Sequence, residues 1–311
     1  MKSLTLIIPI FNEEENISNL CNILIDIQDQ MYKKKTELNV LFIDDGSTDN
    51  WNKIFKEYQK KHNFFNCIKF VRNFGHQAAI MAGLKESESD LYACIDSDLQ
   101  QDPYLLIRMI EELINNQKLK YIHCVKKNSS YENTIKTFFS KYFYRIFTSA
   151  TKINLSPGAS EFWMITKKVR NDIVEDSSAN GFIRGFFYFK GYNGKNIFYE
   201  PKKRKMGSSK FIALKQIDLG LNAFFNFVKK FYLIFFIFSL ISIFFFVTFC
   251  IYVLISFFLD FTTPGWSSIM ILMLFISSFN FLSFSIIVFL LYKLIDIVTK
   301  NKHYYIIKDD D

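Results

Sequence analysis

The chain has 311 residues, enough for one sizeable domain and a further segment, and its formal net charge is +8. The positive charge suits an anionic partner. Because no nucleic-acid-binding motif is present, we exclude nucleic acid and expect an anionic membrane surface. Half of the residues are hydrophobic, and their concentration near the carboxyl end excludes a protein that is water-soluble throughout.

Short apolar runs alternate with segments of helical periodicity over the first 125 residues. The apolar runs predict five strands, at 4–10, 40–43, 67–71, 91–95 and 121–125. Apolar residues at helical spacing predict helices at 17–27, 51–58, 78–84 and 104–114. Regular alternation of this kind predicts an α/β fold with a parallel, doubly wound sheet.

Polar side chains follow the first three predicted strands. Asn12 follows the first strand and is expected to cap the next helix, with acids in the first turn. Asp44 and Asp45 follow the second strand, and Asn73 follows the third. In open α/β sheets the ligand binds at the carboxyl ends of the strands, so we expect these residues to lie close together.

Two carboxylates, Asp96 and Asp98, follow the fourth predicted strand. On an extended chain, residues at i and i+2 point to the same side, so the two side chains should converge. Two carboxylates on a hard cation that also holds substrate phosphates are a common way to bind Mg²⁺. A solvated acidic turn is the alternative, and the position after a buried strand favours the metal site.

Four segments of this half carry a resemblance to a known family. They are Ile8-Pro9-Ile10-Phe11-Asn12-Glu13-Glu14, Asp44-Asp45-Gly46-Ser47-Thr48-Asp49, Asn73-Phe74-Gly75-His76-Gln77 and Asp96-Ser97-Asp98-Leu99-Gln100. In this order they resemble the successive motifs of glycosyltransferase family 2. The similarity is to its polyprenyl-phosphate branch, which includes dolichol-phosphate mannose synthases and bactoprenol glucosyltransferases. The resemblance implies a GT-A (Rossmann-like) fold and inverting sugar transfer.

The same resemblance implies roles for individual residues. The residues implied for the nucleotide-sugar pocket are Pro9, Phe11, Glu13, Asp44, Asp45 and Asp96. Asp96 and Asp98 should meet a divalent cation, Mg²⁺ or Mn²⁺, and the donor diphosphate, with Asp98 catalytic. Gln100 should lie beside the sugar.

The match is looser after the fifth strand. Segment 158–165 resembles the Gly-Asp-Phe-Arg-Leu segment of the family, with Glu161 in place of Asp and Trp163 in place of Arg. Glu161 is therefore a catalytic or positioning candidate, and an edge strand with an incidental Glu is the alternative. The basic, aromatic segment 136–147 predicts either a helix on the membrane surface or an ordinary packed helix.

A basic stretch precedes the apolar end of the chain. Arg184-Gly185 resembles a loop before the donor site, and segment 204–211 resembles the Arg-x-x-Gly-x-Ser-Lys-Tyr segment of the family. The residues implied for binding the acceptor phosphate are Arg184, Arg204, Gly207, Ser209 and Lys210. A lipid-headgroup patch is the alternative interpretation of this run.

Two apolar runs, 231–259 and 269–292, each exceed the roughly 20 residues that a membrane-spanning helix needs. Lysines flank both ends of this hairpin and none lies in its loop, so the positive-inside rule predicts cytosolic termini. The first apolar run, at 4–10, is too short for the hydrophobic core and cleavage site of a signal peptide, so none is expected. The predicted divisions are a catalytic domain (1–210), an interfacial helix (211–228), a transmembrane hairpin (229–300) and a cytosolic tail (301–311).

The resulting hypothesis is transfer of one sugar from a nucleotide-sugar to polyprenyl phosphate at the cytosolic face of a bacterial inner membrane. By family frequency the donor is UDP-glucose and the acceptor undecaprenyl phosphate, for modification of cell-envelope glycans, and a homo-oligomer is left open. A processive polysaccharide synthase is one alternative. It would need a Gln-x-x-Arg-Trp motif, and none of the three Trp follows an Arg. The second alternative is a non-catalytic membrane scaffold. The acidic residues at the strand ends argue against it.

Overall fold

The computed structural model describes residues 1–127, 159–176, 183–201, 232–259 and 265–298. Within these ranges the chain divides into two compact units, an α/β unit and a hairpin of two long helices. The predicted segments 136–147 and 211–228 lie outside the described residues. So do Arg204, Gly207, Ser209 and Lys210 of the basic run.

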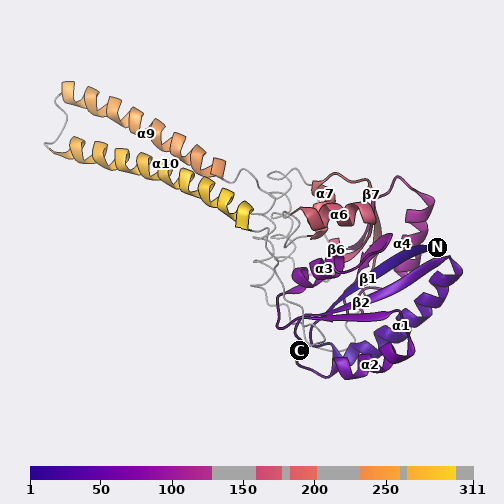
Figure 1. Cartoon of the computed structure of the whole chain (residues 1–311). Helices are drawn as coiled ribbons and strands as arrows, with labels where there is room; N and C mark the ends of the chain where they lie inside the picture. The colour runs from indigo at the N-terminus through magenta and orange to yellow at the C-terminus, as the bar shows by residue number, and fades with distance from the viewer. Residues whose placement is uncertain (128–158, 177–182, 202–231, 260–264, 299–311) are drawn as a thin grey trace. The chain divides into compact units, whose positions relative to one another are not determined.

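The α/β unit is built on a seven-stranded sheet with the order β3-β2-β1-β4-β6-β5-β7 (Figure 1). The strands are β1 (Lys2–Ile10), β2 (Thr36–Asp44), β3 (Phe65–Lys69), β4 (Leu91–Cys94), β5 (Tyr121–Lys126), β6 (Ala159–Thr166) and β7 (Gly194–Tyr199). The helices of this unit within the described ranges are α1 (Glu14–Lys33), α2 (Trp51–Lys61), α3 (His76–Lys85), α4 (Leu105–Asn115), α6 (Lys167–Glu175) and α7 (Ile183–Phe189). The predicted α/β fold is thus confirmed.

The sheet is mixed: the predicted parallel pairing is confirmed for β1 to β4, and β6 departs from it. Strands β1 to β4 pair in parallel, as do β5 and β7. Strand β6 lies between β4 and β5 and runs antiparallel to both. It is an interior strand, which also corrects the alternative that placed Glu161 on an edge strand.

Helices cover both faces of the sheet (Figure 1). Strand side chains alternate between faces, so on β1 Leu6 and Ile8 pack toward α1, α2 and α4, while Ile7 packs toward α3, α6 and α7. Because both faces are buried, β1 and β2 are almost continuously apolar, as expected of interior parallel strands.

The buried Arg170 of α6 fixes the carboxyl end of α3. Its guanidinium donates to the carbonyl oxygens of Leu84 (2.6 Å), Ser87 (2.8 Å) and Lys85 (3.2 Å). A cation at a helix carboxyl terminus interacts favourably with the helix dipole and satisfies carbonyls that the helix leaves unpaired. The anchor matters because the other end of α3 enters the candidate site.

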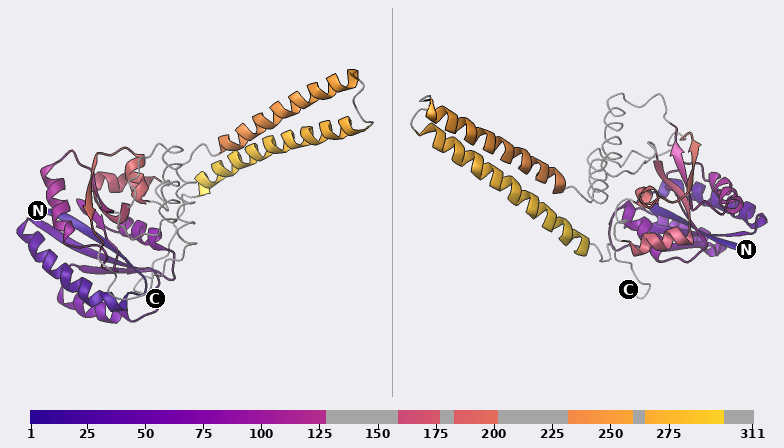
Figure 2. Two further views of the ribbon diagram at one scale, coloured as in Figure 1. Left: turned by 180° about the vertical axis from the view of Figure 1, so that it is seen from behind. Right: turned by 90° about the horizontal axis from the view of Figure 1, so that it is seen from above.

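The second unit consists of α9 (Tyr232–Phe258) and α10 (Trp266–Val298), which lie side by side along their length (Figure 2). Both contain stretches long and apolar enough to cross a membrane, Phe236–Phe258 and Trp266–Leu291. The two helices share a hydrogen bond between the hydroxyls of Ser242 and Ser278 (3.2 Å). Two apolar helices were predicted here, and α10 continues six residues beyond the predicted end at Tyr292.

Candidate active site

The predicted site residues gather at one edge of the sheet. Strands β1 to β4 are parallel, so their carboxyl ends share this edge, and β1 extends beside β2 as far as the Ile10–Asp44 pair. Because β6 is antiparallel, its first residues lie at the same edge, with Trp163 opposite Cys94 at the end of β4. Glu161 therefore joins Asp96 at this edge, although it lies 65 positions later in the sequence.

The loops that follow β1 and β2 are tied together by Asn12. Its side-chain oxygen accepts hydrogen bonds from the backbone N–H groups of Thr48 (2.8 Å) and Asp49 (3.3 Å). Its own N–H donates to the Ser47 hydroxyl (3.0 Å), and its φ is 56°. The prediction that Asn12 caps α1 was wrong. Glu13 holds the cap position, and the Asn12 side chain is committed to the neighbouring loop.

Three further residues implied for the nucleotide pocket lie in β1 or in the loop that follows it. Pro9 is buried within β1 beside Ile43, and Phe11 is exposed just beyond the strand end. The Glu13 carboxylate accepts a hydrogen bond from the Asn16 side chain (2.7 Å). Their contacts with a nucleotide stay predictions.

Asp44 is a buried carboxylate at the end of β2, only 1% exposed. Its Oδ1 accepts a hydrogen bond from the Ser47 N–H (2.8 Å), whereas Oδ2 is buried without a hydrogen-bond partner among the described residues. A buried acceptor that lacks a donor is costly, and native proteins leave few of them. The position is therefore suited to a donor group from a ligand.

Asp45 organises the loop that precedes α3. Its carboxylate accepts hydrogen bonds from the backbone N–H groups of Phe74 (2.7 Å) and Gly75 (2.9 Å). Burial raises the pKa of Asp45, and these hydrogen bonds oppose that effect without cancelling it. The contacts hold the start of α3 against the end of β2, and a role of Asp45 in the nucleotide wall stays a prediction.

Asp96 is held by two side chains to which sequence reasoning gave no role. His76 Nε2 lies 2.9 Å from Oδ1, and the Gln101 amide donates to Oδ2 (2.8 Å) while its oxygen accepts from the Asp96 N–H (3.1 Å). Burial acts to raise the pKa of Asp96, but the hydrogen bond and charge of His76 and the Arg184 charge outweigh it and lower the pKa. His76 belongs to the segment Asn73-Phe74-Gly75-His76-Gln77, one of those that resemble the family, and this membership is the feature of the sequence that could have indicated a role in the site.

Asp98 and Gln100 lie in a tight turn just beyond Asp96. Asp98 Oδ1 accepts a hydrogen bond from the Gln100 N–H (3.1 Å), and Leu99 between them has a φ of 57°. That left-handed conformation is unusual for a residue with a branched side chain, and such residues cluster at functional sites. Both Asp98 and Gln100 are half-buried, so the turn presents them at the surface of the edge.

The two aspartates fit a hard divalent cation by their chemistry. Carboxylate oxygens are the ligands that Mg²⁺ and Mn²⁺ prefer. Among the residues with described positions, no three or more His, Cys, Asp or Glu side chains lie so that they could hold a metal ion together. A cation held by Asp96 and Asp98 would complete its coordination with ligand phosphate oxygens and water, as Mg²⁺ commonly does.

Glu161 is surrounded by donors from three elements. The Gln77 amide of α3 donates to Oε1 (3.0 Å), and the Trp163 indole of β6 donates to Oε2 (3.4 Å). Arg184 forms an ion pair with Oε1, with Nε at 3.5 Å. The resemblance placed Arg184 in a loop. It lies instead in the first turn of α7. From the sequence, Gln77 was assigned no role.

His123 in β5 supports the strand that carries Glu161. It is fully buried, with Nε2 2.6 Å from the Ser160 carbonyl oxygen and Nδ1 3.1 Å from the Tyr188 hydroxyl. Burial lowers the pKa of His123 to about 4, and the hydrogen bond to Ser160 opposes this shift only in part. The imidazole is therefore neutral in the folded chain and donates to Ser160 through Nε2.

This pKa predicts a dependence of stability on pH. Between pH 6.5 and 4 the unfolded chain protonates His123 and the folded chain does not, so the free energy of unfolding should fall as the pH falls. At one pKa unit per 1.36 kcal/mol, the loss is at most about 3 kcal/mol. Urea unfolding across this range should show a shallower pH dependence for His123→Gln than for the wild type. Parallel curves would contradict the assignment.

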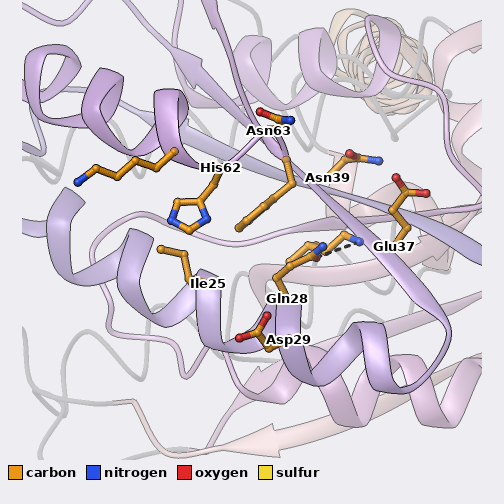
Figure 3. Close-up of a pocket in the computed structure, with 10 residues that line it drawn as sticks. Ile25, Gln28, Asp29, Glu37, Asn39, His62 and Asn63 are labelled. Carbon is orange, nitrogen blue, oxygen red and sulfur yellow. Dashed lines mark hydrogen bonds between the residues drawn. The ribbon is translucent and has the colours of Figure 1, made fainter.

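A surface pocket of about 540 Å³ lies at the opposite edge of the sheet (Figure 3). Its lining comes from α1, from the start of β2 and from the residues that precede β3, including Gln28, Glu37 and His62. The Gln28 side-chain oxygen accepts a hydrogen bond from the Leu38 N–H (3.2 Å). Since this is the amino edge of β2 and β3, the pocket is separate from the carboxylate-rich site.

Comparisons with known proteins bear on this site. The sequence profile of the family described as Glycosyl transferase family 2 matches residues 5–174. YkcC of Bacillus subtilis, described as an uncharacterized glycosyltransferase, is 28% identical over 288 residues, covering 91% of this chain and 86% of that protein. The bactoprenol glucosyl transferase of Shigella phage SfV is 27% identical over 226 residues, covering 72% of this chain and 71% of that protein.

A solved structure supports the expected GT-A architecture. Glucosyl-3-phosphoglycerate synthase from Mycobacterium tuberculosis, in complex with Mn²⁺, UDP and phosphoglyceric acid, aligns with a TM-score of 0.51. The sequences are 14% identical, and the alignment covers 72% of this chain and 77% of that chain. At this identity the likeness shows a shared fold.

Proposed function

Since the chain belongs to glycosyl transferase family 2 and is a glycosyltransferase, we propose that it transfers a single sugar from a nucleotide-sugar to a polyprenyl phosphate. The observation that carries the proposal is the gathering of Asp44, Asp96, Asp98 and Glu161 at one sheet edge, with Arg184 beside Glu161. The similarity to bactoprenol glucosyl transferases supports the acceptor class, and UDP-glucose is the proposed donor.

The donor is bound by the loops after β1, β2 and β4. The buried Asp44 Oδ2 accepts a hydrogen bond from the nucleoside. The nucleoside thereby supplies the N–H or O–H group that the described residues do not offer to this oxygen. Asp96 and Asp98 would hold Mg²⁺ or Mn²⁺, which would neutralise charge on the leaving diphosphate. His76 and Gln101 keep the Asp96 carboxylate ionised and oriented toward that place.

The acceptor needs little activation by the protein. A phosphate monoester has a second pKa near 6, so at pH 7 its oxygen is already an anionic nucleophile. That oxygen attacks the anomeric carbon as the bond to the diphosphate oxygen breaks, with inversion. Arg184, together with Arg204, Gly207, Ser209 and Lys210 of the basic run, would position the lipid phosphate and offset repulsion between the two anions.

The helices α9 and α10 support a membrane-bound enzyme whose acceptor stays in the lipid layer. We propose that both termini and the site face the cytosol, where nucleotide-sugars are made, and that the hairpin loop faces outward. The charge asymmetry across the hairpin supports this orientation, because lysines flank it and its loop contains neither Lys nor Arg.

A panel of radiolabelled nucleotide-sugars tests the function. Membranes that contain the protein should incorporate label from one donor, with UDP-glucose expected, into a lipid extract as a lipid-linked monosaccharide. A labelled polymer would instead indicate a processive synthase, and release of free sugar without lipid product would remove the proposed acceptor. Membranes that contain the Asp98→Asn variant provide the matched background.

A further inference from the structure

Gln77 occupies a position between three elements of the site. Its side-chain Nε2 donates to Glu161 Oε1 on β6 (3.0 Å), and its Oε1 accepts from the Ile183 N–H at the start of α7 (3.2 Å). A backbone N–H can only donate and a carboxylate oxygen can only accept. The two partners therefore fix which end of the amide faces which way.

The contact at Ile183 determines where Arg184 lies. Ile183 is fully buried in the core that α3, α6 and α7 share, and Arg184 is the next residue of the same helical turn. Arg184 lies beside the same Glu161 oxygen that accepts from Gln77. One amide thus sets both members of the Glu161–Arg184 ion pair.

The neighbouring residue of α3 serves the donor side of the site. His76 contacts Asp96, while Gln77 contacts Glu161, so consecutive residues of the first turn of α3 touch two different carboxylates. The turn itself is held by Asp45 through Phe74 and Gly75, and the far end of the helix by Arg170. This rigid helix is a suitable element on which to set the spacing of the two groups.

We propose that Gln77 is a positioning residue for the acceptor phosphate. It holds Glu161 and the first turn of α7 in one arrangement, which aims the Arg184 guanidinium at the acceptor. In this arrangement Glu161 is not the general base. Both of its oxygens face donors of the chain, and it orients Arg184 while the anionic phosphate supplies its own nucleophile. The inference rests on the proposed function and adds a mechanism for acceptor placement.

Two substitutions distinguish the two hydrogen bonds of the Gln77 side chain, one to Glu161 and one from Ile183. Gln77→Met removes both hydrogen bonds at nearly constant size. We expect kcat/KM for the polyprenyl phosphate to fall at least about tenfold, the loss of one hydrogen bond to a charged group. Donor affinity, measured by calorimetry with UDP-glucose, should stay within about twofold. Gln59→Met is the control. It removes a single hydrogen bond from Gln59 of α2 to the carbonyl oxygen of Phe65 at the start of β3, and it should leave both quantities unchanged.

Gln77→Glu keeps the acceptor for the Ile183 N–H but sets a second carboxylate against Glu161. Two carboxylates this close cannot both ionise readily, so lipid transfer by this variant should recover at lower pH as the pair takes up a shared proton. The other charged or titratable groups that face this region are Arg184, His76 and Asp96. They are present in the variant and in the wild type alike, so their contribution to the pH dependence cancels when the two pH profiles are compared. A role limited to folding would lower activity at every pH alike.

The outcomes distinguish this inference from the proposed function. If the wild type forms no lipid-linked sugar with any donor, the proposed function fails. If the wild type forms it and Gln77→Met matches the wild type, the inference alone is overturned. Equal losses of donor and acceptor affinity in Gln77→Met, or no recovery of Gln77→Glu at low pH, would also overturn it. The Gln77→Glu profile still decides the matter if Gln77→Met does not fold.

Discussion

Asp98→Asn is expected to lower the rate of sugar transfer by about a thousandfold or more, on the order of 4 kcal/mol of transition-state stabilisation. The substitution keeps the size of the side chain and removes its charge. It therefore removes the electrostatic attraction to a divalent cation at the point where the leaving diphosphate gains charge. The protein should fold normally, because Asp98 is half-buried at the surface of the turn.

Asp102→Asn is the matched control for this prediction. Asp102 lies in the same loop, where its carboxylate accepts a hydrogen bond from the Tyr104 N–H at the start of α4 (3.4 Å). We expect its activity to stay near that of the wild type. Calorimetry with Mn²⁺ and UDP should show weakened cation binding for Asp98→Asn and unchanged binding for Asp102→Asn. Wild-type turnover by Asp98→Asn in the presence of EDTA would refute the metal assignment.

Gly46→Ala is expected to destabilise the α/β unit by about 3 kcal/mol or more and to abolish most activity. A Cβ at this position would lie 2.5 Å from the carbonyl carbon of Arg72 and 2.7 Å from the Asn73 nitrogen, both backbone atoms that cannot turn aside. The φ of 75° adds strain for any residue with a Cβ. The loops after β2 and β3 would separate, and Asp45 would lose its hold on Phe74 and Gly75.

Gly191→Ala isolates the steric part of that effect. Gly191 has a similar φ of 67°, but a Cβ there would meet nothing within 4 Å. It should cost only the backbone strain, about 1–2 kcal/mol. Urea unfolding of both variants measures the difference, and activity assays show whether His76 and Gln77 have moved. Equal destabilisation by the two substitutions would mean that the close approach of the loops is not what requires glycine at position 46.

The sequence by itself determined the local features of this protein. Hydrophobic periodicity depends on which faces of a segment are buried, so it predicted the first five strands, the helices between them and the two apolar helices of the hairpin. It also placed Asp44, Asp96 and Asp98 at strand ends, because acidic residues directly follow buried apolar runs. Parallel pairing of β1 to β4 then brought those ends to one edge.

Only the tertiary structure decided how the second half of the site is assembled. Strand direction depends on the pairing of β6 with β4 and β5, which are distant in sequence, and an apolar run carries no signal of its partner or its direction. The antiparallel insertion of β6 brings Glu161 to the carboxylate edge, and α7 brings Arg184 to Glu161. Asn12 likewise has the residue type of a helix cap. Its bonds go to the neighbouring loop because the packing of β1 beside β2 places Thr48 within reach.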